Sequence, residues 1–526
     1  MESLCLRHTE LPHTSTLFSD YLYHFERVAA FYDLAPFAPA SFRSAARRLD
    51  DYPAERRRAL VEALREQNDD AAALEKLARP DTVVVATGQQ VGLFGGPSYT
   101  VYKALTAIRL ARWLTDQGTP AVPVFWLASE DHDFAEVNHS WVYGPSHEPV
   151  RIYAGASSGD GGPVGSVPVP YGIVDDLRRT LSGFAFADDV TALAGETYVA
   201  GRSFAEAFRA LMGKLLPGYG LLYLDPLRPA MRELAAPMLR RALESSSELV
   251  AKVIERNRAL EDAGYHAQVH VEPESSLLFL LAGSRRLPLR RDEDGYRAGT
   301  QRVSREQLAE RAAQLSPNAL LRPVVQDYML PVAATVVGPG EAAYFAQSQV
   351  LYHSLLGRMP VIAPRAGFTL LDSRAERLLL RYGLDLDHFF NGQEAVLDHI
   401  ASRLVPPGMN RSLSDSLAAV RQQLDRLRVD LSTFDSTLVA AFEKSRRKIV
   451  YQFEKLERKA AREALRRDER ARSEATFLNG LIYPEKHLQE RLYSILPFLA
   501  KHGFDIVGRI YENIAVDGAD HQILVL

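Results

Sequence analysis

The chain has 526 residues, of which 47% are hydrophobic and 24% are charged, and this composition is typical of an ordinary folded globular protein. Its length exceeds what one hydrophobic core usually serves, so we expect two or more domains, or one core with large insertions. The 62 Lys and Arg residues nearly balance the 66 Asp and Glu residues. Because the formal net charge is only -4, we expect no general attraction to nucleic acid or to an anionic membrane.

The start of the chain and its cysteine content bear on its compartment. The segment MESLCLRHTELPHTS has no basic region followed by a long apolar stretch, and no apolar run approaches the roughly 20 residues that span a bilayer. The only cysteine, Cys5, can form no internal disulfide and belongs to no cluster of metal ligands. We therefore expect a cytoplasmic protein in which Cys5 has no chemical role.

The first segments in chain order have helical patterns. Residues 20–78 read as helices, and the stretch 54–78 repeats the apolar spacing of the stretch 19–32. The apolar residues at helical spacing in the first stretch are Tyr21, Phe25, Val28 and Phe31.

The period then changes to that of a βαβ unit. DTVVVA (81–86) predicts a buried strand, TVYKALTAIRLARWLTDQG (100–118) a helix that ends at Gly118, and TPAVPVFWLA (119–128) a second buried strand. Such units place their two strands in parallel in a sheet that is covered on both faces. The glycine-rich turn TGQQVGLFGGP (87–97) then lies at the carboxyl end of a parallel strand, where open α/β sheets bind ligands.

This turn matches neither common phosphate-binding motif. Gly96 is followed by Pro97 where a P-loop needs Lys and then Ser or Thr, and the glycine spacing differs from that of a dinucleotide fingerprint. Gly96 and Pro97 direct the free N–H groups of the helix start toward the turn, so an anion can bind there. The alternative is a turn that needs glycine for backbone geometry alone. The candidate donors are Gly88, Gln89, Gln90 and Gly92.

The second strand ends in LASEDHDFAEVNH (127–139), which places acids at the same edge of the sheet. Acids there can bind an ammonium group, coordinate Mg²⁺ or act as a general base, and a histidine can move a proton near neutral pH. The alternative is an acidic first helical turn capped by Asp133 and Glu136. Two polar clusters at the ends of adjacent strands favour a binding site. His132 and His139 lack the partners of a zinc site, so we expect no bound metal of that kind. The catalytic candidates are Asp131, His132 and Asp133, with Glu130 as a substrate ligand.

The remaining segments predict insertions into an α/β core and a return to it. The stretch 150–215 is rich in Gly, Ser and Pro, and the strand–helix pattern resumes at YGLLYLDP (219–226). Four short antiparallel strands are predicted over 265–300, in HAQVHVEP, SSLLFLLAG, RRLPLRR and DGYRAG. Residues 317–365 return to helices, buried strands and a second glycine–proline turn, GPGE. The expected segments are 1–149 (N-terminal helices and first half of the core), 150–218 (insertion), 219–264 (core), 265–315 (small β-rich insertion), 316–371 (second half of the core), 372–480 (helical coiled coil) and 481–526 (tail returning to the core).

Residues 410–479 contain no Gly and no Pro, and their apolar positions alternate steps of four and three. Such a seam requires a partner helix. Because one continuous rod would be about 100 Å long, we expect an antiparallel hairpin that turns near residues 432–437. The basic stretch 443–472 is interpreted as a solvated coiled-coil face rather than a nucleic-acid site. The seam residues are Leu413, Leu417, Val420, Leu424, Leu427, Leu431, Phe434 and Leu438, with Ile449, Phe453 and Leu456 on the returning arm.

Several motifs together resemble a known family. They are TGQQVGLFGGPSYTVYKA, PVFWLASEDHDFAEVNH, LLRPVVQDYMLPVAATVVGPGEAAYFAQ, the long coiled coil and LQERLYSILPFLAKHG, in this order. In these the chain resembles the bacillithiol synthase family, the cysteine ligases of bacillithiol biosynthesis. The resemblance implies a Rossmann-like core with connecting insertions, a coiled coil that forms a homodimer, and condensation of cysteine with glucosaminyl malate. It places both substrates in a pocket between TGQQ and SEDHDF.

The means of activating the carboxylate is left open by the residues. Relatives with similar cores form an adenylate with a histidine pair at the first helix start, where this chain has Phe94-Gly95-Gly96-Pro97, and no KMSKS-like lysine loop is present. Consumption of ATP or ADP, and use of Mg²⁺, therefore stay open. The amine must be deprotonated before it attacks, and the acid and histidine cluster of residues 131–133 is the candidate for that step.

Further ligands are expected from the second half of the core. Arg322, Gln326 and Arg365 are candidate carboxylate ligands, although a surface ion pair would explain either arginine equally well. Asn138 and His139 complete the expected pocket, with a core histidine bonded to the backbone as the alternative. Two other functions stay open: a nucleotide- or metabolite-binding coiled-coil scaffold without turnover, and a pantothenate-synthetase-like nucleotidyltransferase.

Overall fold

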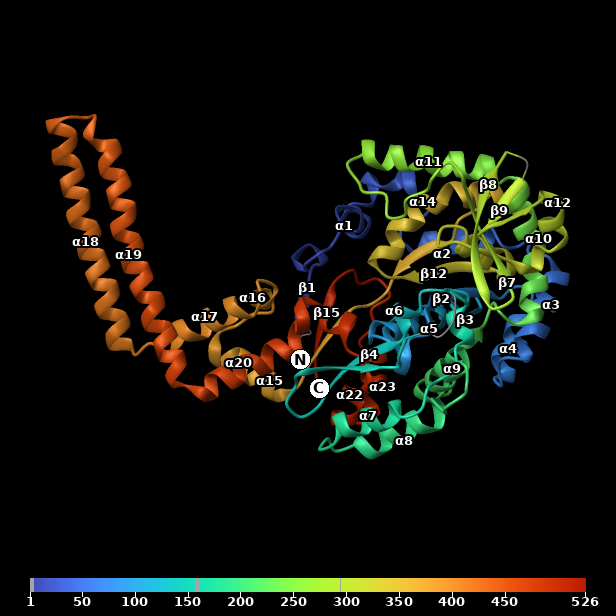
Figure 1. Ribbon diagram of the computed structural model, residues 1–526, viewed down its shortest axis with the longest axis horizontal. Helices are drawn as coiled ribbons and strands as arrows, with labels where there is room; N and C mark the ends of the chain where they lie inside the picture. Colours follow the sequence, from blue (N-terminus) through green and yellow to red (C-terminus); the bar gives the residue numbers. More distant parts are fainter. Residues whose placement is uncertain (1–3, 157–160, 294) are drawn as a thin grey trace.

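In the computed structural model, which describes residues 4–156, 161–293 and 295–526, the core is a five-stranded parallel sheet (Figure 1). The strand order is β13-β12-β2-β3-β6, and each neighbouring pair is parallel. The predicted α/β class and the predicted parallel sheet are therefore confirmed. The strands are β2 (Val83–Gln89), β3 (Ala121–Leu127), β6 (Leu222–Leu224), β12 (Val332–Val337) and β13 (Val361–Pro364).

Three predicted stretches extend beyond the described residues. Residues 1–3 of the first expected segment, residues 157–160 of the expected insertion and Asp294 of the expected strand DGYRAG lie outside them.

The order of the central sheet reverses between β2 and β12. β3 and β6 follow β2 on one side, and the chain then returns to place β12 on the other side of β2. The crossover helices are α5 (Tyr99–Asp116), between β2 and β3, and α14 (Pro339–Leu355), between β12 and β13. Such a reversal opens a crevice at the carboxyl ends of the two strands, which is where α/β sheets bind ligands.

Strand β2 runs further than its apolar pattern predicts. It ends at Gln89 rather than at residue 86, and Gly88 pairs with Trp126 of β3. A Cβ atom on Gly88 would lie 2.8 Å from the Trp126 carbonyl oxygen, so this close approach requires glycine. The first part of the predicted turn is therefore the last part of a strand.

The N-terminal region is helical, with one exception. Its helices are α1 (Thr16–Tyr23), α2 (Pro39–Arg47), α3 (Ala54–Arg65) and α4 (Ala71–Ala78). The predicted helix over 19–32 is wrong beyond Tyr23, because His24 leaves the helical region (φ -142°, ψ 52°) and two 3₁₀ turns follow. Val28 and Phe31 are still buried, so their spacing reported a core face rather than a continuous helix.

Two insertions separate the core strands. The first, between β3 and β6, contains α6 (Phe134–Val137), β4 (His139–Tyr143), β5 (Pro149–Tyr153), α7 (Ile173–Leu181), α8 (Ala187–Thr197) and α9 (Phe204–Leu215). The second, between β6 and β12, contains α10 (Pro229–Glu244), α11 (Ser246–Asp262), β7 (Ser275–Ala282), β8 (Arg285–Asp292), β9 (Gly295–Ala298), β10 (Gln301–Val303), α12 (Arg305–Glu310), β11 (Leu315–Pro317) and α13 (Arg322–Met329). Strands β7 to β11 form a separate antiparallel sheet. The predicted strand HAQVHVEP is wrong, because residues 266–273 form no strand.

The two ends of the chain meet in a third sheet. β1 (Leu4–Leu6), β15 (His521–Val525) and β14 (Phe368–Leu371) are neighbours, with β15 in the middle. The C-terminal helices are α15 (Ser373–Tyr382), α16 (Asp387–Phe390), α17 (Gln393–Leu404), α18 (Pro407–Phe434), α19 (Leu438–Arg467), α20 (Glu469–Ile482), α21 (Gln489–Leu492), α22 (Leu496–His502) and α23 (Asp505–Glu512).

Helices α18 and α19 form an antiparallel hairpin that projects away from the core (Figure 1). The chain turns between Phe434 and Leu438, so the predicted hairpin is confirmed. The partner helix covers only part of the seam: Leu417 and Leu424 are buried, whereas Leu427 is 46% exposed and Leu456 is 51% exposed.

The described residues contain no helix that is both long enough and apolar enough to cross a membrane.

Candidate active site

Two neighbouring cavities lie at the carboxyl ends of the core strands. The larger has a volume of about 550 Å³ and the smaller about 500 Å³. The larger lies at the β2–β12 reversal, between the turn that follows β2 and the GPGE turn that follows β12. The smaller lies against the start of α5, strand β4 and the segment around α21. Both cavities are lined by Gln89, Gln90, Tyr99 and Arg491.

Gln90 joins the two predicted polar clusters. Its Nε2 donates to Asp131 Oδ2 at 2.8 Å and to Glu136 Oε2 at 2.5 Å. The glycine-rich turn and the acidic segment therefore face one another across the cavities, as their positions after adjacent strands predict.

Asp131 is held as a carboxylate. The backbone N–H of His132 donates to its Oδ1 at 2.7 Å, and Arg286 Nη1 lies 3.7 Å from the same oxygen. Burial alone would raise the pKa of Asp131, but the hydrogen bonds from His132 and Gln90 and the positive charge of Arg286 lower it well below its usual range. At neutral pH Asp131 is thus suited to hold a positively charged group.

His132 lies beside Asp131, and its ring is tilted against that of Phe279 at a centroid distance of 5.6 Å. Its Nδ1 lies 3.1 Å from Arg286 Nη1 and 3.5 Å from Asp131 Oδ1. Because a guanidinium can only donate, the shorter contact requires a lone pair on Nδ1 and, in the neutral ring, a hydrogen on Nε2. The side chain is 44% exposed, so a proton that it takes up can pass to solvent.

Lys103 connects the ends of β2 and β12. Its Nζ donates to Glu341 Oε2 at 2.6 Å, to the Gly88 carbonyl at 2.5 Å and to Gln89 Oε1 at 3.2 Å. The lysine side chain is buried, and its burial lowers its pKa while Glu341 opposes that shift. This pair holds the two glycine-containing turns on opposite sides of the larger cavity.

The two predicted arginines differ in their partners. Arg365 makes two hydrogen bonds to Glu490, at 2.9 and 2.5 Å, and this pair is buried. Burial would raise the pKa of Glu490, but the charge of Arg365 lowers it to about 2, so the pair stays ionised. Arg322 instead donates to Tyr344 Oη at 3.0 Å and to Gln326 Oε1 at 3.4 Å. Within the described part of the chain no carboxylate forms an ion pair with Arg322, so its charge is available to an anion in the larger cavity.

Most predicted site residues line one or both cavities. They are Gly88, Gln89, Gln90, Gly92, Glu130, Asp131, His139, Arg322 and Arg365. Glu130 is nevertheless paired with the buried Arg232, which also donates to the Ala313 carbonyl at 2.8 Å. The charge of Glu130 is therefore balanced by an arginine that does not line the cavity.

Four predicted residues are absent from the described cavity walls: His132, Asp133, Asn138 and Gln326. Asp133 is the N-cap of α6 and accepts from the Ala135 N–H at 3.0 Å, which is the helix-cap alternative for this acid. Asn138 donates to the Gly155 carbonyl at 3.2 Å, and its Oδ1 lies 3.2 Å from His139 Nδ1. Gln326 orients Arg322, as described above.

Sequence reasoning missed several polar residues of the site: Tyr99, Lys103, Glu136, Arg286, Glu341, Tyr344 and Arg491. Lys103 is four residues into α5, and its long side chain turns back toward the end of β2, which its position in the sequence does not reveal. The GPGE sequence after β12 was a usable signal for Glu341. No local pattern indicates that Arg286, in the β-rich insertion, or Arg491, in the C-terminal tail, reaches the core.

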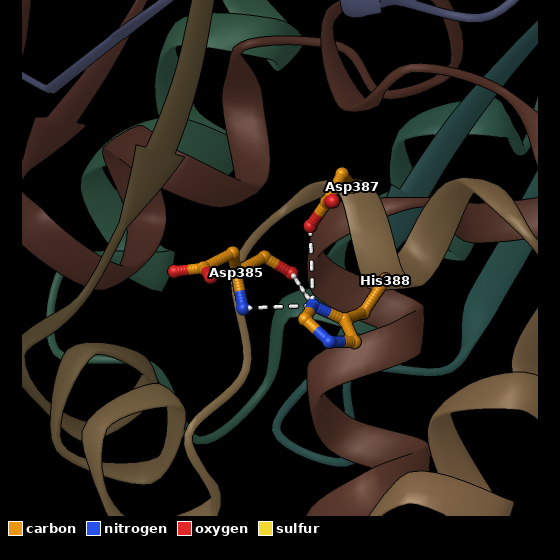
Figure 2. Close-up of side chains that lie close together, drawn as sticks. All are labelled: Asp385, Asp387 and His388. Carbon is orange, nitrogen blue, oxygen red and sulfur yellow. Dashed lines mark hydrogen bonds and ion pairs between the residues drawn. The ribbon is translucent and has the colours of Figure 1, made fainter.

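A third cavity, larger than these two, lies elsewhere. It has a volume of about 1230 Å³ and shares no lining residue with the two site cavities. Near it, Asp385, Asp387 and His388 are the one group of three possible metal ligands within the described ranges (Figure 2). His388 Nδ1 lies 3.1 Å from the Asp385 N–H and 3.1 Å from Asp387 Oδ1, while the Asp385 carboxylate points away from the ring. The His388 ring is thus held by contacts within its own exposed loop.

The fold and the cavities define a Rossmann-like α/β protein with a polar small-molecule site at the reversal of its strand order. The chain belongs to the family described as bacillithiol biosynthesis BshC. Residues 1–366 match the N-terminal Rossmann-like domain of that family, and residues 368–526 match its C-terminal coiled-coil domain.

Proteins that are similar over nearly the whole chain share one name. A protein of Solibacter usitatus is 52% identical over 526 residues, with 100% of both chains covered. A protein of Koribacter versatilis is 37% identical with 97% of both chains covered, and one of Salinibacter ruber is 33% identical with 97% of this chain and 96% of its own covered. Each of the three is named "Putative cysteine ligase BshC".

Proposed function

We propose that this protein is a carbon–nitrogen ligase of bacillithiol biosynthesis, which joins the carboxyl group of cysteine to the glucosamine amine of glucosaminyl malate. Family membership supports the reaction class. The observation that carries the proposal is the 2.8 Å contact of Gln90 with an ionised Asp131 at the border of two polar cavities. An amide-forming reaction requires an amine and a carboxyl group to be held next to each other, and two adjoining cavities can do this.

The residues at this border have distinct roles in the proposal. Asp131 holds the ammonium form of the sugar amine and takes the proton that the amine must lose before it attacks. His132 lies outside the cavity walls, so in the proposal it receives this proton from Asp131, 3.5 Å away, and passes it to solvent. Arg322, a cation without an acidic partner, binds a malate carboxylate. Gln90 fixes Asp131, and Asp133 keeps the start of α6 in place.

Activation of the cysteine carboxylate by ATP or ADP was left open by the sequence. The start of α5 does not fit adenylate formation by a histidine pair, because Phe94 is buried and Gly95 and Gly96 offer no side chain. The larger cavity does not offer the group of free carboxylates that Mg²⁺ prefers either, since Glu130 and Glu341 are already paired with Arg232 and Lys103 and Asp131 alone is left. We therefore assign no step to a nucleotide or to Mg²⁺.

The proposal is tested by incubating purified protein with cysteine, glucosaminyl malate and ATP. Bacillithiol, AMP and ADP are measured together. Formation of bacillithiol supports ligation, and the nucleotide product identifies the co-reactant. Pyrophosphate release without bacillithiol would favour a nucleotidyltransferase, and substrate binding without any product would favour a scaffold.

A pair of variants at neighbouring acids separates catalysis from folding. Asp131→Asn should lower kcat/KM by about 10²- to 10⁴-fold, the range for loss of a positioned acid–base group. Asp133→Asn changes an exposed cap outside both cavities and should lower kcat/KM by less than about threefold. Equal losses in the two variants would contradict the role of Asp131.

We further propose that the protein is a cytoplasmic homodimer formed through the α18–α19 hairpin. The hairpin leaves apolar side chains uncovered, among them Leu427, Ile449 at 39% exposure and Leu456 at 51% exposure. A second hairpin packed against this face would remove them from water.

The dimer is tested by light scattering after size exclusion. The double variant Ile449→Glu/Leu456→Glu should give a monomer, because two charges would be buried in the interface. Lys455→Glu, an exposed charge change beside Leu456, should remain a dimer. A dimer that persists in the double variant would place the interface elsewhere.

A further inference from the structure

The smaller cavity is distinct from the larger one. Its walls include Trp141 of β4, Thr100 of α5 and Leu492 of α21, none of which lines the larger cavity. The two cavities share the wall formed by Gln89, Gln90, Tyr99 and Arg491. Reacting groups held in the two cavities would therefore face each other at this wall.

The charges that line the two cavities differ. The larger cavity has the cations Lys103, Arg286, Arg322, Arg365 and Arg491 and the acids Glu130, Asp131 and Glu341. The smaller cavity has one arginine, Arg491, and one acid, Glu136, together with the histidines His139 and His487. An excess of cations suits a substrate with several carboxylates, whereas one charge of each sign suits a zwitterion.

We propose that the smaller cavity is the site for an α-amino acid, with its ammonium group on Glu136 and its carboxylate toward Arg491. This inference rests on the proposed ligase function, in which the amino acid is cysteine. Arg491 lines both cavities, so a carboxylate held there lies at the shared wall, where the amine of the other substrate must reach it. Glu136 lines the smaller cavity only and Asp131 the larger cavity only, although both accept from Gln90 Nε2, so the two amino groups are held on opposite sides of the shared wall.

The remaining walls fit the rest of a cysteine molecule. Val137, Trp141 and Leu492 are apolar and suit a thiol-bearing side chain, because a thiol behaves as a small hydrophobic group. Pro97 and Thr100, at the start of α5, lie on the same walls, and the positive end of a helix favours a carboxylate. The Thr100 hydroxyl is buried and has no hydrogen-bond partner in the described structure, so the protein itself does not satisfy this group.

Glu136 is free to bind a cation while it keeps its contact with Gln90. Only its Oε2 accepts from Gln90, at 2.5 Å. Within the described residues the side chain of Arg491 forms no ion pair or hydrogen bond, so it is available to a carboxylate.

The test compares affinities for L-cysteine and for two analogues by calorimetry on the full-length protein. The first analogue, 3-mercaptopropionate, lacks the ammonium group, and the second, cysteamine, lacks the carboxylate. The wild type should bind L-cysteine at least about tenfold more tightly than either analogue. Glu136→Gln should remove the preference over 3-mercaptopropionate, and Arg491→Gln should remove the preference over cysteamine.

Matched controls separate this result from misfolding. Glu136→Gln keeps an acceptor for Gln90 and should leave the Kd for glucosaminyl malate within about twofold, since Glu136 does not line the larger cavity. Glu148→Gln, an exposed change outside both cavities, should retain both preferences. Because each outcome is a ratio of affinities in one protein, a partly destabilised variant still reports it.

Retention of both preferences in the two variants, or their absence from the wild type, would overturn the assignment. Turnover in the wild type with an unchanged KM for cysteine in Glu136→Gln would leave the ligase proposal standing and refute this compartment. Selective binding of cysteine that depends on Glu136, without any turnover, would keep the compartment and refute the ligase.

Discussion

Arg322 and Arg365 show why charge alone does not identify a ligand residue. Both arginines line the larger cavity, but the guanidinium of Arg365 is paired with a buried Glu490, whereas that of Arg322 contacts only neutral groups. An anion that enters the cavity gains more from the cation that has no acid beside it. Binding of the malate part should therefore depend more on Arg322 than on Arg365.

Arg322→Gln should raise the KM for glucosaminyl malate by about 10- to 100-fold, because a hydrogen bond to a charged group contributes about 1.5–3 kcal/mol. The KM for cysteine should change by less than about threefold, since Arg322 does not line the smaller cavity. Arg311→Gln, an exposed change outside both cavities, is the control for steady-state kinetics. An equal rise in both KM values would indicate a general disturbance of the core.

The sequence predicted those site residues whose positions follow from strand order. Gln90 and Asp131 follow adjacent parallel strands, and this alone brings them to one edge of the sheet. Arg286 was not predictable, because it depends on how a separate antiparallel sheet packs over that edge. Asp133 fits the alternative that the sequence left open: its acidic side chain, close to Asp131 in the chain, caps a helix. Neighbouring residues after a strand point in different directions, so a cluster in sequence is not a cluster in space.

The same distinction holds for whole elements. The parallel strands and the hairpin of α18 and α19 were predicted well, because a short continuous apolar run indicates a buried strand and a heptad repeat indicates a helix with a partner. The residues 24–31 were not, because buried 3₁₀ turns and a helix present similar apolar spacing. The extension of β2 to Gln89 was missed because its last residues are polar and face the site.

The link between β2 and β12 is the element-scale feature that shapes the site. Lys103 on α5 contacts the end of β2 through Gly88 and the start of α14 through Glu341. Lys103→Met should lower the free energy of unfolding by about 3 kcal/mol, because it leaves the Glu341 carboxylate without its partner. The measurement is urea unfolding followed by tryptophan fluorescence, with Trp126 on the larger cavity as a local reporter.

Addition of Glu341→Gln to Lys103→Met should recover part of that loss. The double variant no longer holds an unpaired charge at the β2–β12 crevice, and the two side chains are in direct contact, so their effects should not add. If the losses of unfolding free energy in the two single variants simply add in the double variant, the contact between Lys103 and Glu341 contributes nothing to stability.

At the scale of the whole molecule, the C-terminal tail closes the chain onto the site. β15 pairs with β1 at the beginning of the chain and with β14, and the Glu490 of the tail joins Arg365 beside the larger cavity. The tail also supplies Arg491, which lies between the two cavities. The C-terminal region, which carries the coiled coil, is thus part of the site rather than an attached module.

Two buried histidines make this closure sensitive to acid. His521 on β15 is fully buried, and its Nε2 lies 2.8 Å from Thr369 Oγ1. His8 lies near His521, and its ring packs against Phe18 with a centroid distance of 5.3 Å. Burial, together with the charge of His521, lowers the pKa of His8 to about 3, and burial also lowers the pKa of His521. The folded protein therefore binds fewer protons than the unfolded chain below pH 6.5, so this stability is present above pH 6.5 and is lost as the pH falls toward 3.

From the His8 shift alone, the fall from pH 7 to pH 5 should cost about 2 kcal/mol. His8→Phe keeps an aromatic ring against Phe18 and removes this titration, so its stability should change less over the same pH range than that of the wild type. The measurement is thermal unfolding at each pH, with hydrogen exchange of β1 and β15 to locate the change. Replacement of the exposed His266 by Gln is the control and should follow the wild type. If His8→Phe loses as much stability on acidification as the wild type, with equal exchange in both strands, the acid sensitivity does not arise where the chain ends meet.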